Sequence, residues 1–139
     1  MVVAPEHVNI GGARFSEWVE AARREQRRRE AAYHEGLQPP SLAGRDVVIV
    51  DDGIATGWTG RAAVRVLRGM GCGRVALAAP VTPPDTVAAL AAECDLLEVP
   101  VVAEPFPGVS AFYGDFGDVA DATVVRLIQL AAGALSQSE

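Results

Sequence analysis

The sequence predicts an α/β fold, a parallel sheet with flanking helices, from two observations. Short runs of branched aliphatic residues stand at 47–50, 74–81 and 96–102, and segments with the apolar spacing of a helix lie between them. Strands and helices that alternate at these lengths are joined by crossovers, which make neighbouring strands parallel. Half of the 139 residues are hydrophobic, so one domain over 1–139 can bury a core. Its expected parts are a lead-in and helix (1–40), an α/β core (41–133) and a polar tail (134–139).

The composition excludes several classes of partner. The net charge is −6, so neither nucleic acid nor an anionic membrane is expected to bind. All twelve basic residues are arginine, so a phosphate site has to use backbone amides, hydroxyls or arginine instead of lysine. No secretory leader or long apolar run is recognisable, and we expect a cytoplasmic protein. Cys72 and Cys94 lack metal-ligand spacing, and we expect buried, unreactive thiols.

The N-terminal part predicts one helix. Residues 1–13 have no clear period and receive no assignment, whereas 14–35 is rich in helix-favouring Arg, Glu and Ala. Two oppositely charged pairs at the i,i+4 spacing support this helix: Glu20 with Arg24, and Glu25 with Arg29. An apolar stripe is expected to face the rest of the fold: Phe15, Trp18, Val19 and Ala22. Glutamate interrupts the basic tract "RREQRRRE", which we interpret as a solvated helix face.

The core begins with a buried strand at 47–50 and a helix at 59–70. Gly71 is placed to end this helix, because glycine favours the left-handed position after a helix C-terminus. One side of the helix is apolar and is expected to pack on the sheet: Ala62, Ala63, Val66, Leu67 and Met70.

The second half of the core repeats this order. A buried strand is expected at 74–81, and the helix after it is expected to have Thr82 as N-cap and Pro83 at its first position. A third strand is expected at 96–102, and a closing helix at 118–132.

Two carboxylates, Asp51 and Asp52, stand where the first strand ends. Ligands of open parallel sheets bind beyond such strand ends, and the following loop enters a helix N-terminus, where free N–H groups favour phosphate. Segment 51–59 therefore offers carboxylates for hydroxyls or a hydrated divalent cation, and an amide cradle for phosphate. Ribose 5-phosphate carries both kinds of group. A helix cap would explain one aspartate, but two acids, two threonines and a glycine together favour a binding function.

Two other phosphate-handling folds are excluded by composition. Phosphate-accepting receiver domains and nucleotide P-loops also place polar residues after a strand, but both need a lysine, and this chain has none.

The stretch "VVIVDDGIATGWT" resembles the PRPP-binding motif of type I phosphoribosyltransferases. The resemblance extends over nearly the whole chain, through "RRREAAYHEGLQPPSLAGRDVVIVDDGIATG", "APVTPPDTVAAL" and "EPFPGVSAFYGDF", to a bacterial subgroup in which some members are fused to hydrolase domains. It implies a Rossmann-like core.

The resemblance also implies roles for single residues. Asp51 and Asp52 would bind the ribose hydroxyls of PRPP, which also coordinate Mg²⁺. The loop would hold the 5-phosphate through its amides and the two threonine hydroxyls: Ala55, Thr56, Gly57, Trp58 and Thr59.

Two loop residues depart from the family pattern. The hypoxanthine-guanine branch carries an aspartate where this chain has Ala55, so a 6-oxopurine substrate is disfavoured. Trp58 occupies a position that is usually small, and its side chain has to point away from the phosphate to leave the pocket open.

A third departure concerns the N-terminal side. Full-length members begin with a strand and a loop that grips pyrophosphate, followed by a flexible segment, and we expect this chain to start after them. Sugar and phosphate could then be held without the groups that stabilise departing pyrophosphate. The missing strand would leave a hydrophobic sheet edge, so we expect a homo-oligomer or a partner chain to cover it.

The loop at 104–117 is the candidate nucleobase pocket. Phe106, Phe112 and Tyr113 are placed to stack on a base, although aromatic residues that merely cover the sheet are an equal alternative. Asp115 resembles an aspartate that helps to hold Mg²⁺ in some relatives.

Three functions remain open at this stage. The first is transfer of phosphoribosyl from PRPP to a nucleobase-type acceptor with release of pyrophosphate, as part of nucleotide metabolism. The second is a non-catalytic module, a degenerate copy that binds a nucleotide or PRPP and acts through a partner chain. The third is a structural companion to a hydrolase.

Overall fold

The computed structural model describes residues 12–33 and 41–135, which form two compact units. One unit holds residues 41–116, and the other combines 12–33 with 117–135. Parts of the expected lead-in, linker and tail lie outside the described residues: 1–11, 34–40 and 136–139.

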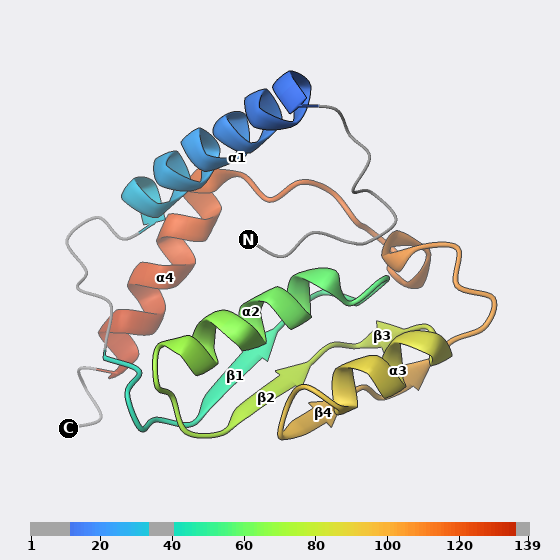
Figure 1. Cartoon of the computed structure of the whole chain (residues 1–139). Helices are drawn as coiled ribbons and strands as arrows, with labels where there is room; N and C mark the ends of the chain where they lie inside the picture. The colour runs from blue at the N-terminus through green and yellow to red at the C-terminus, as the bar shows by residue number, and fades with distance from the viewer. Residues whose placement is uncertain (1–11, 34–40, 136–139) are drawn as a thin grey trace. The chain divides into compact units, whose positions relative to one another are not determined.

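The first unit is built on parallel strands, which confirms the predicted α/β class. Strands β1 (Val47–Val50), β2 (Val75–Ala78) and β4 (Leu96–Glu98) form one sheet in the order β1-β2-β4 (Figure 1). Strands β3 (Val81–Thr82) and β5 (Val101–Val102) form a second parallel pair.

Prolines divide two of the predicted strands. The run expected at 74–81 breaks between β2 and β3, and the run expected at 96–102 breaks between β4 and β5. Pro80 and Pro100 stand in these breaks, where the missing N–H prevents a continuous ladder. Both breaks lie at the same level, so β3 and β5 still pair with each other.

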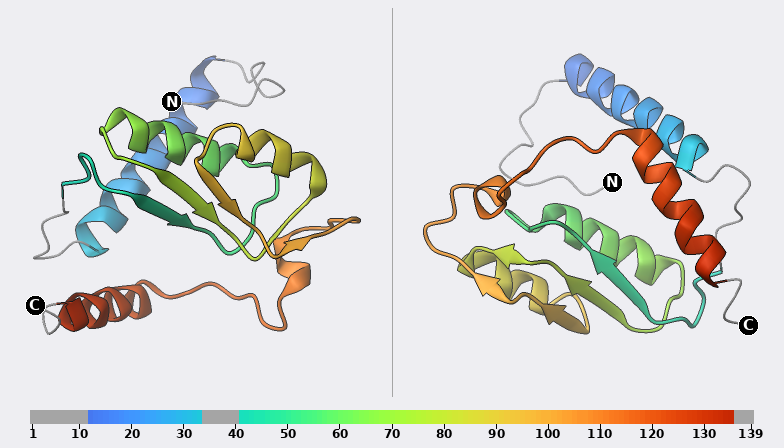
Figure 2. Two further views of the ribbon diagram at one scale, coloured as in Figure 1. Left: turned by 90° about the horizontal axis from the view of Figure 1, so that it is seen from below. Right: turned by 180° about the vertical axis from the view of Figure 1, so that it is seen from behind.

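Helices α2 (Trp58–Gly69) and α3 (Pro84–Ala91) lie on the same face of the sheet (Figure 2). They close the core around four buried side chains: Ile54, Leu77, Ala79 and Leu90. The opposite face carries Val48 and Val50, which are 62% and 77% exposed. The expectation of a buried strand at 47–50 is therefore wrong for Val48 and Val50, because the helices of residues 41–116 cover one face only.

The buried side of α2 also differs from the predicted one. Gly60 and Val64 are buried, whereas Val66 and Met70, expected on the core side, are 62% and 54% exposed. The helix turns this side inward because Gly60 packs so closely on Leu77 that an added Cβ would lie 3.1 Å from Leu77 Cδ2. Hydrophobic spacing alone did not distinguish these two sides.

The ends of the two helices test two predictions. Gly71 follows α2 with φ +73°, and the Gly71 and Cys72 N–H groups donate to the Arg68 and Leu67 carbonyls, so the expected glycine stop is confirmed. The expected start of α3 is wrong, because Thr82 lies in β3 and Pro83 takes the N-cap position.

The second unit is formed by α1 (Gly12–Tyr33) and α4 (Asp121–Leu135), which pack together (Figure 1). Arg28 Nη1 lies 2.6 Å from Asp121 Oδ2, and Tyr33 Oη donates to Asp121 Oδ1 at 2.7 Å. The closing helix therefore begins three residues later than the predicted Asp118, at the residue that receives both bonds.

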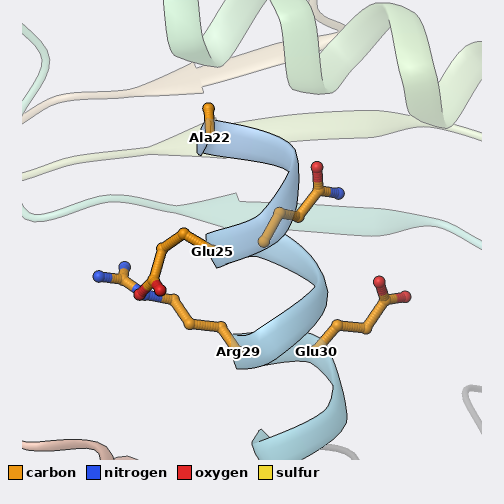
Figure 3. Close-up of a pocket in the computed structure, with 5 residues that line it drawn as sticks. Ala22, Glu25, Arg29 and Glu30 are labelled. Atoms are coloured by element: carbon orange, nitrogen blue, oxygen red, sulfur yellow. The ribbon is translucent and has the colours of Figure 1, made fainter. Parts of the chain in front are cut away.

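Helix α1 confirms the predicted helix over residues 14–33 and begins two residues earlier, at Gly12, whereas the predicted positions 34 and 35 lie outside the described residues. Of the expected apolar stripe, Phe15 and Val19 are half-buried, whereas Trp18, at 56%, and Ala22 are exposed. The side chains of Glu25 and Arg29 point toward one another and pair at 2.7 Å, as predicted (Figure 3). Glu20 pairs with Arg23 instead of Arg24, because the i,i+3 spacing also brings side chains together on a helix.

Candidate functional site

The loop between β1 and α2 is tied to the elements beside it by its own backbone. The Ile54 N–H donates to the Val81 carbonyl at 2.9 Å. The Ile54 carbonyl accepts a hydrogen bond from the Thr82 hydroxyl at 2.8 Å, and the Ala55 carbonyl accepts one from the Thr86 hydroxyl at 2.7 Å. The loop is therefore anchored on its inner side by β3 and α3.

Gly57 makes the turn from this loop into α2. It has φ +75° and is buried, and an added Cβ would lie 3.0 Å from Thr86 Cγ2 and 3.3 Å from Leu90 Cδ2. A side chain at this position would be strained by both the backbone angle and the contact. The glycine of the sequence motif is thus required by the fold itself.

The outer side of the loop presents backbone donors. In the part of the chain that the structure describes, the N–H groups of residues 55–59 meet no acceptor. A pocket of about 320 Å³ lies beside them. The pocket is lined by the loop, the first turn of α2 and one residue from further along the chain: Asp51, Gly53, Ile54, Ala55, Thr56, Gly57, Trp58, Thr59, Gly60 and Val109.

The two aspartates differ in burial and in whether they line this pocket. Asp51 is half-buried, lines the pocket and accepts the Asp52 N–H at 2.9 Å through Oδ1. Asp52 is exposed and does not line the pocket, and its carbonyl accepts a hydrogen bond from the Tyr113 hydroxyl. Neither carboxylate pairs with an arginine among the described residues.

The aromatic loop reaches the same strand end. The 3-10 turn η2 (Val109–Phe112) brings Val109 against Gly53, so closely that an added Cβ on Gly53 would lie 2.5 Å from Val109 Cγ1. Tyr113 follows and bonds to the Asp52 backbone. The rings of Phe106 and Phe112 stack with centroids 5.4 Å apart. Of these three predicted base-pocket residues, Tyr113 contacts the acid pair, and none lines the 320 Å³ pocket.

Asp115 is not gathered with the acid pair into a metal cluster. Over residues 12–33 and 41–135, no three His, Cys, Asp or Glu side chains come together to hold a metal ion. The other predicted metal residues, Asp51 and Asp52, are neighbours at the end of β1.

Trp58 packs against the guanidinium of Arg61, which is itself held by an ion pair with Glu93 that the sequence pattern did not indicate. Its ring lies beneath the Arg61 guanidinium, with 4.6 Å between the ring centroid and Cζ. Arg61 Nε lies 2.6 Å from Glu93 Oε1, and Arg65 also bonds to Glu93. The hydrogen bond from Arg61 holds the pKa of Glu93 below its usual range. Trp58 therefore forms a fixed wall of the pocket, although only the i,i+3 spacing of Trp58 and Arg61 was visible in the sequence.

Two other hollows occur among the described residues, and neither is lined by the loop that follows β1. A hollow of about 580 Å³ lies on α1, and its lining contains the paired Glu25 and Arg29 (Figure 3). A third pocket, of about 370 Å³, lies on the open face of the sheet at Val48 and Leu96. Neither contains a residue that the sequence pattern singled out for binding.

The two cysteines are half-buried, and burial raises the pKa of the Cys94 thiol, which donates to the Leu90 carbonyl.

None of the helices in the described parts is both long and apolar enough to cross a bilayer.

Comparison with known proteins points to one family. The model of the "Phosphoribosyl transferase domain" matches residues 15–106. Two proteins of Mycobacterium tuberculosis, from strains CDC 1551 and H37Rv, carry the description "Putative phosphoribosyl transferase". Each is 41% identical to this chain over 109 residues, which is 77% of this chain and 24% of the relative. The chain thus spans about a quarter of the length of these curated relatives.

A solved structure is similar over most of this chain. The crystal structure of TT1426 from Thermus thermophilus superposes with a TM-score of 0.71 at 34% identity. The match covers 91% of this chain and 61% of that protein.

Proposed function

This chain belongs to the phosphoribosyl transferase domain family, and we propose that segment 51–59 binds the ribose 5-phosphate part of PRPP. The reaction is transfer of phosphoribosyl to a nucleobase-type acceptor. A nitrogen of the acceptor forms a bond to C1 of the ribose while the C1–O bond to pyrophosphate breaks, pyrophosphate leaves with the electron pair, and the proton of that nitrogen passes to water.

The row of backbone N–H groups at residues 55–59 carries this proposal. These donors have no acceptor among the described residues, and they border the 320 Å³ pocket at the N-terminus of α2. Free amides and the helix dipole at such a position favour a phosphate. No arginine of the described chain lines the pocket, so the amides and the hydroxyls of Thr56 and Thr59 supply the binding groups.

The acid pair takes the sugar end of the ligand. Asp51 borders the pocket, so its carboxylate can accept a hydrogen bond from a ribose hydroxyl. The exposed Asp52 carboxylate lies outside the pocket lining at the same strand end, and we assign it to the neighbouring hydroxyl. The chain then acts by positioning the C1 atom, which lowers the barrier without a general base.

A magnesium ion fits the donor set at the strand end. Mg²⁺ prefers carboxylate oxygens and retains several waters, and the carboxylates of Asp51 and Asp52 have no arginine partner in the described residues. Both would hold the ion through the ribose hydroxyls or water. When bound, the ion would neutralise charge on the pyrophosphate.

The acceptor base is assigned to the aromatic loop. Tyr113 bonds to the Asp52 backbone, and Phe106 stacks on Phe112, so flat apolar surfaces stand near the sugar site. Ala55 provides no carboxylate for the N7 proton of a 6-oxopurine, so we propose another class of base.

A binding module without turnover is the second candidate. One observation favours it: no arginine or lysine of the described residues lines the 320 Å³ pocket, so no cationic side chain there can stabilise departing pyrophosphate. Such a module would bind PRPP or a nucleotide through the same pocket and would release no pyrophosphate.

Titration calorimetry with PRPP and Mg²⁺, beside a pyrophosphate-release assay with a panel of bases, tests both candidates. We expect the double variant Asp51→Asn, Asp52→Asn to bind at least about tenfold more weakly, because it loses two charged acceptors. Asp118→Asn, in an exposed loop, is the matched control and should bind as the wild type does.

The outcomes separate the candidates. Binding with pyrophosphate release supports the transferase, and binding without release supports the module. If neither PRPP nor ribose 5-phosphate binds to the wild-type chain, the ligand assignment is wrong.

A further inference from the structure

Two threonines hold two consecutive carbonyls of the phosphate loop. Thr82 is fully buried in β3 and donates to the Ile54 carbonyl at 2.8 Å. Thr86, in the first turns of α3, is 7% exposed and donates to the Ala55 carbonyl at 2.7 Å. Both threonines lie about thirty residues further along the chain than the carbonyls that they bind.

These hydrogen bonds determine where the loop amides point. A peptide unit is planar, and in the trans form its C=O and N–H point in opposite directions. The only cis peptide among the described residues is Glu104–Pro105, so the peptides joining Ile54, Ala55 and Thr56 are trans. When Thr82 and Thr86 draw the two carbonyls inward, the N–H groups of Ala55 and Thr56 therefore point outward.

The outward direction is the one that an anion would need. The N–H groups of Ala55 and Thr56 have no acceptor in the described residues, and both residues line the 320 Å³ pocket. A rotated peptide would instead place a carbonyl oxygen toward the pocket, where it would repel a phosphate oxygen. Donors that are oriented before the ligand arrives cost little ordering when it binds.

We propose that Thr82 and Thr86 are positioning residues that hold the Ile54–Ala55 and Ala55–Thr56 peptides with their N–H groups toward the phosphate. This rests on the proposed function, since the phosphate belongs to the same ribose 5-phosphate site. Neither threonine touches the ligand; each acts through the peptide that it holds. If either carbonyl turned outward, the buried hydroxyl that now bonds to it would lose its hydrogen-bond acceptor.

A crossed pair of substitutions at Thr86 separates positioning from packing. Thr86→Val keeps the shape of the side chain and removes the hydroxyl, whereas Thr86→Ser keeps the hydroxyl and removes the methyl group that lies near Gly57. Titration of the full chain with ribose 5-phosphate is expected to show about 3- to 10-fold weaker binding for the valine variant and wild-type affinity for the serine variant. The same result is expected for Thr82→Val and Thr82→Ser, and Thr123→Val on α4 is the control.

A measurement without ligand keeps this proposal separate from the ligand assignment. The ¹³C shift of the Ala55 carbonyl reports its hydrogen bond, and it should change in Thr86→Val and stay in Thr86→Ser. Equal affinities of the valine variant and the wild type, weakened binding of the serine variant alone, or an unchanged Ala55 shift in Thr86→Val would each overturn the positioning role. If the wild type binds no ribose 5-phosphate, the proposed function fails, and the carbonyl shifts still decide whether the threonines hold the peptides.

Discussion

Arg61 on α2 and Glu93 in the turn that follows α3 form an ion pair, with 2.6 Å between Arg61 Nε and Glu93 Oε1. Their side chains are only 24% and 19% exposed, so the pair is better shielded from solvent than the others in the described residues. The same guanidinium covers the ring of Trp58, which lines the 320 Å³ pocket. The ion pair therefore fixes the side chain that packs on this wall of the pocket.

The first prediction concerns the pH dependence of this pair. The hydrogen bond from Arg61 lowers the pKa of Glu93 below its usual 4.5, so the pair stabilises the fold above that pH and is lost as the pH falls through the folded-state pKa. Glu93→Gln should lower the melting temperature at pH 7. The difference from wild type should shrink as the pH is lowered below about 4.5.

Thermal denaturation followed by circular dichroism at a series of pH values measures this difference. Glu98→Gln, whose side chain is in no ion pair among the described residues, is the matched control. A gap between Glu93→Gln and wild type that stays constant down to pH 3 would contradict the role given to the pair.

The second prediction concerns the glycine before α2. Gly57→Ala should destabilise the chain by about 1 to 3 kcal/mol, because φ +75° disfavours a side chain and the new Cβ would press on Thr86 and Leu90. Gly69→Ala is the control, since it lies in α2 with nothing within 4 Å of its added Cβ. It should be neutral or slightly stabilising. Urea unfolding gives both values, and equal stabilities for the two variants would be inconsistent with the turn geometry.

The third prediction tests the contact between the loop that follows β1 and η2. Gly53→Ala should cost about 1 to 3 kcal/mol, because its Cβ would lie 2.5 Å from Val109 Cγ1. Shortening the partner with Val109→Ala removes that clash, so the glycine substitution should cost clearly less in the Val109→Ala background. A double-mutant cycle by urea unfolding measures the coupling. Purely additive costs would mean that the two side chains do not meet in solution.

The fourth prediction concerns the unit formed by α1 and α4. The hydrogen bond that Tyr33 donates to Asp121 raises the pKa of the Tyr33 phenol above 10.0. Asp121→Asn should therefore bring the Tyr33 pKa back toward its usual value, which absorbance at the phenolate band can follow in a Tyr113→Phe background. The raised pKa also means that the contribution of this bond to stability is present below pH 10 and lost as the pH rises through the folded-state pKa. Asp118→Asn should leave the titration unchanged.

Local patterns predicted most of the elements and the family of the chain. Aliphatic runs placed β1 at Val47–Val50 without error, and helical spacing located α1, α2 and α4 to within a few residues. The expected glycine stop after α2 was confirmed. The match of residues 15–106 to the phosphoribosyl transferase domain confirms the family indicated by "VVIVDDGIATGWT". Turn chemistry and periodicity act over a few neighbouring residues, so the sequence is sufficient to predict such features.

Tertiary contacts decided how those elements are used. Thr82 had the chemistry of a helix N-cap, yet its hydroxyl reaches a carbonyl 28 positions earlier in the chain. The inward side of α2 depends on how closely Gly60 approaches Leu77, and the fixed position of Trp58 depends on Glu93, 35 residues away. Hydrogen bonds and packing of this kind join residues that only the folded chain brings together, so no periodicity in the sequence contains them.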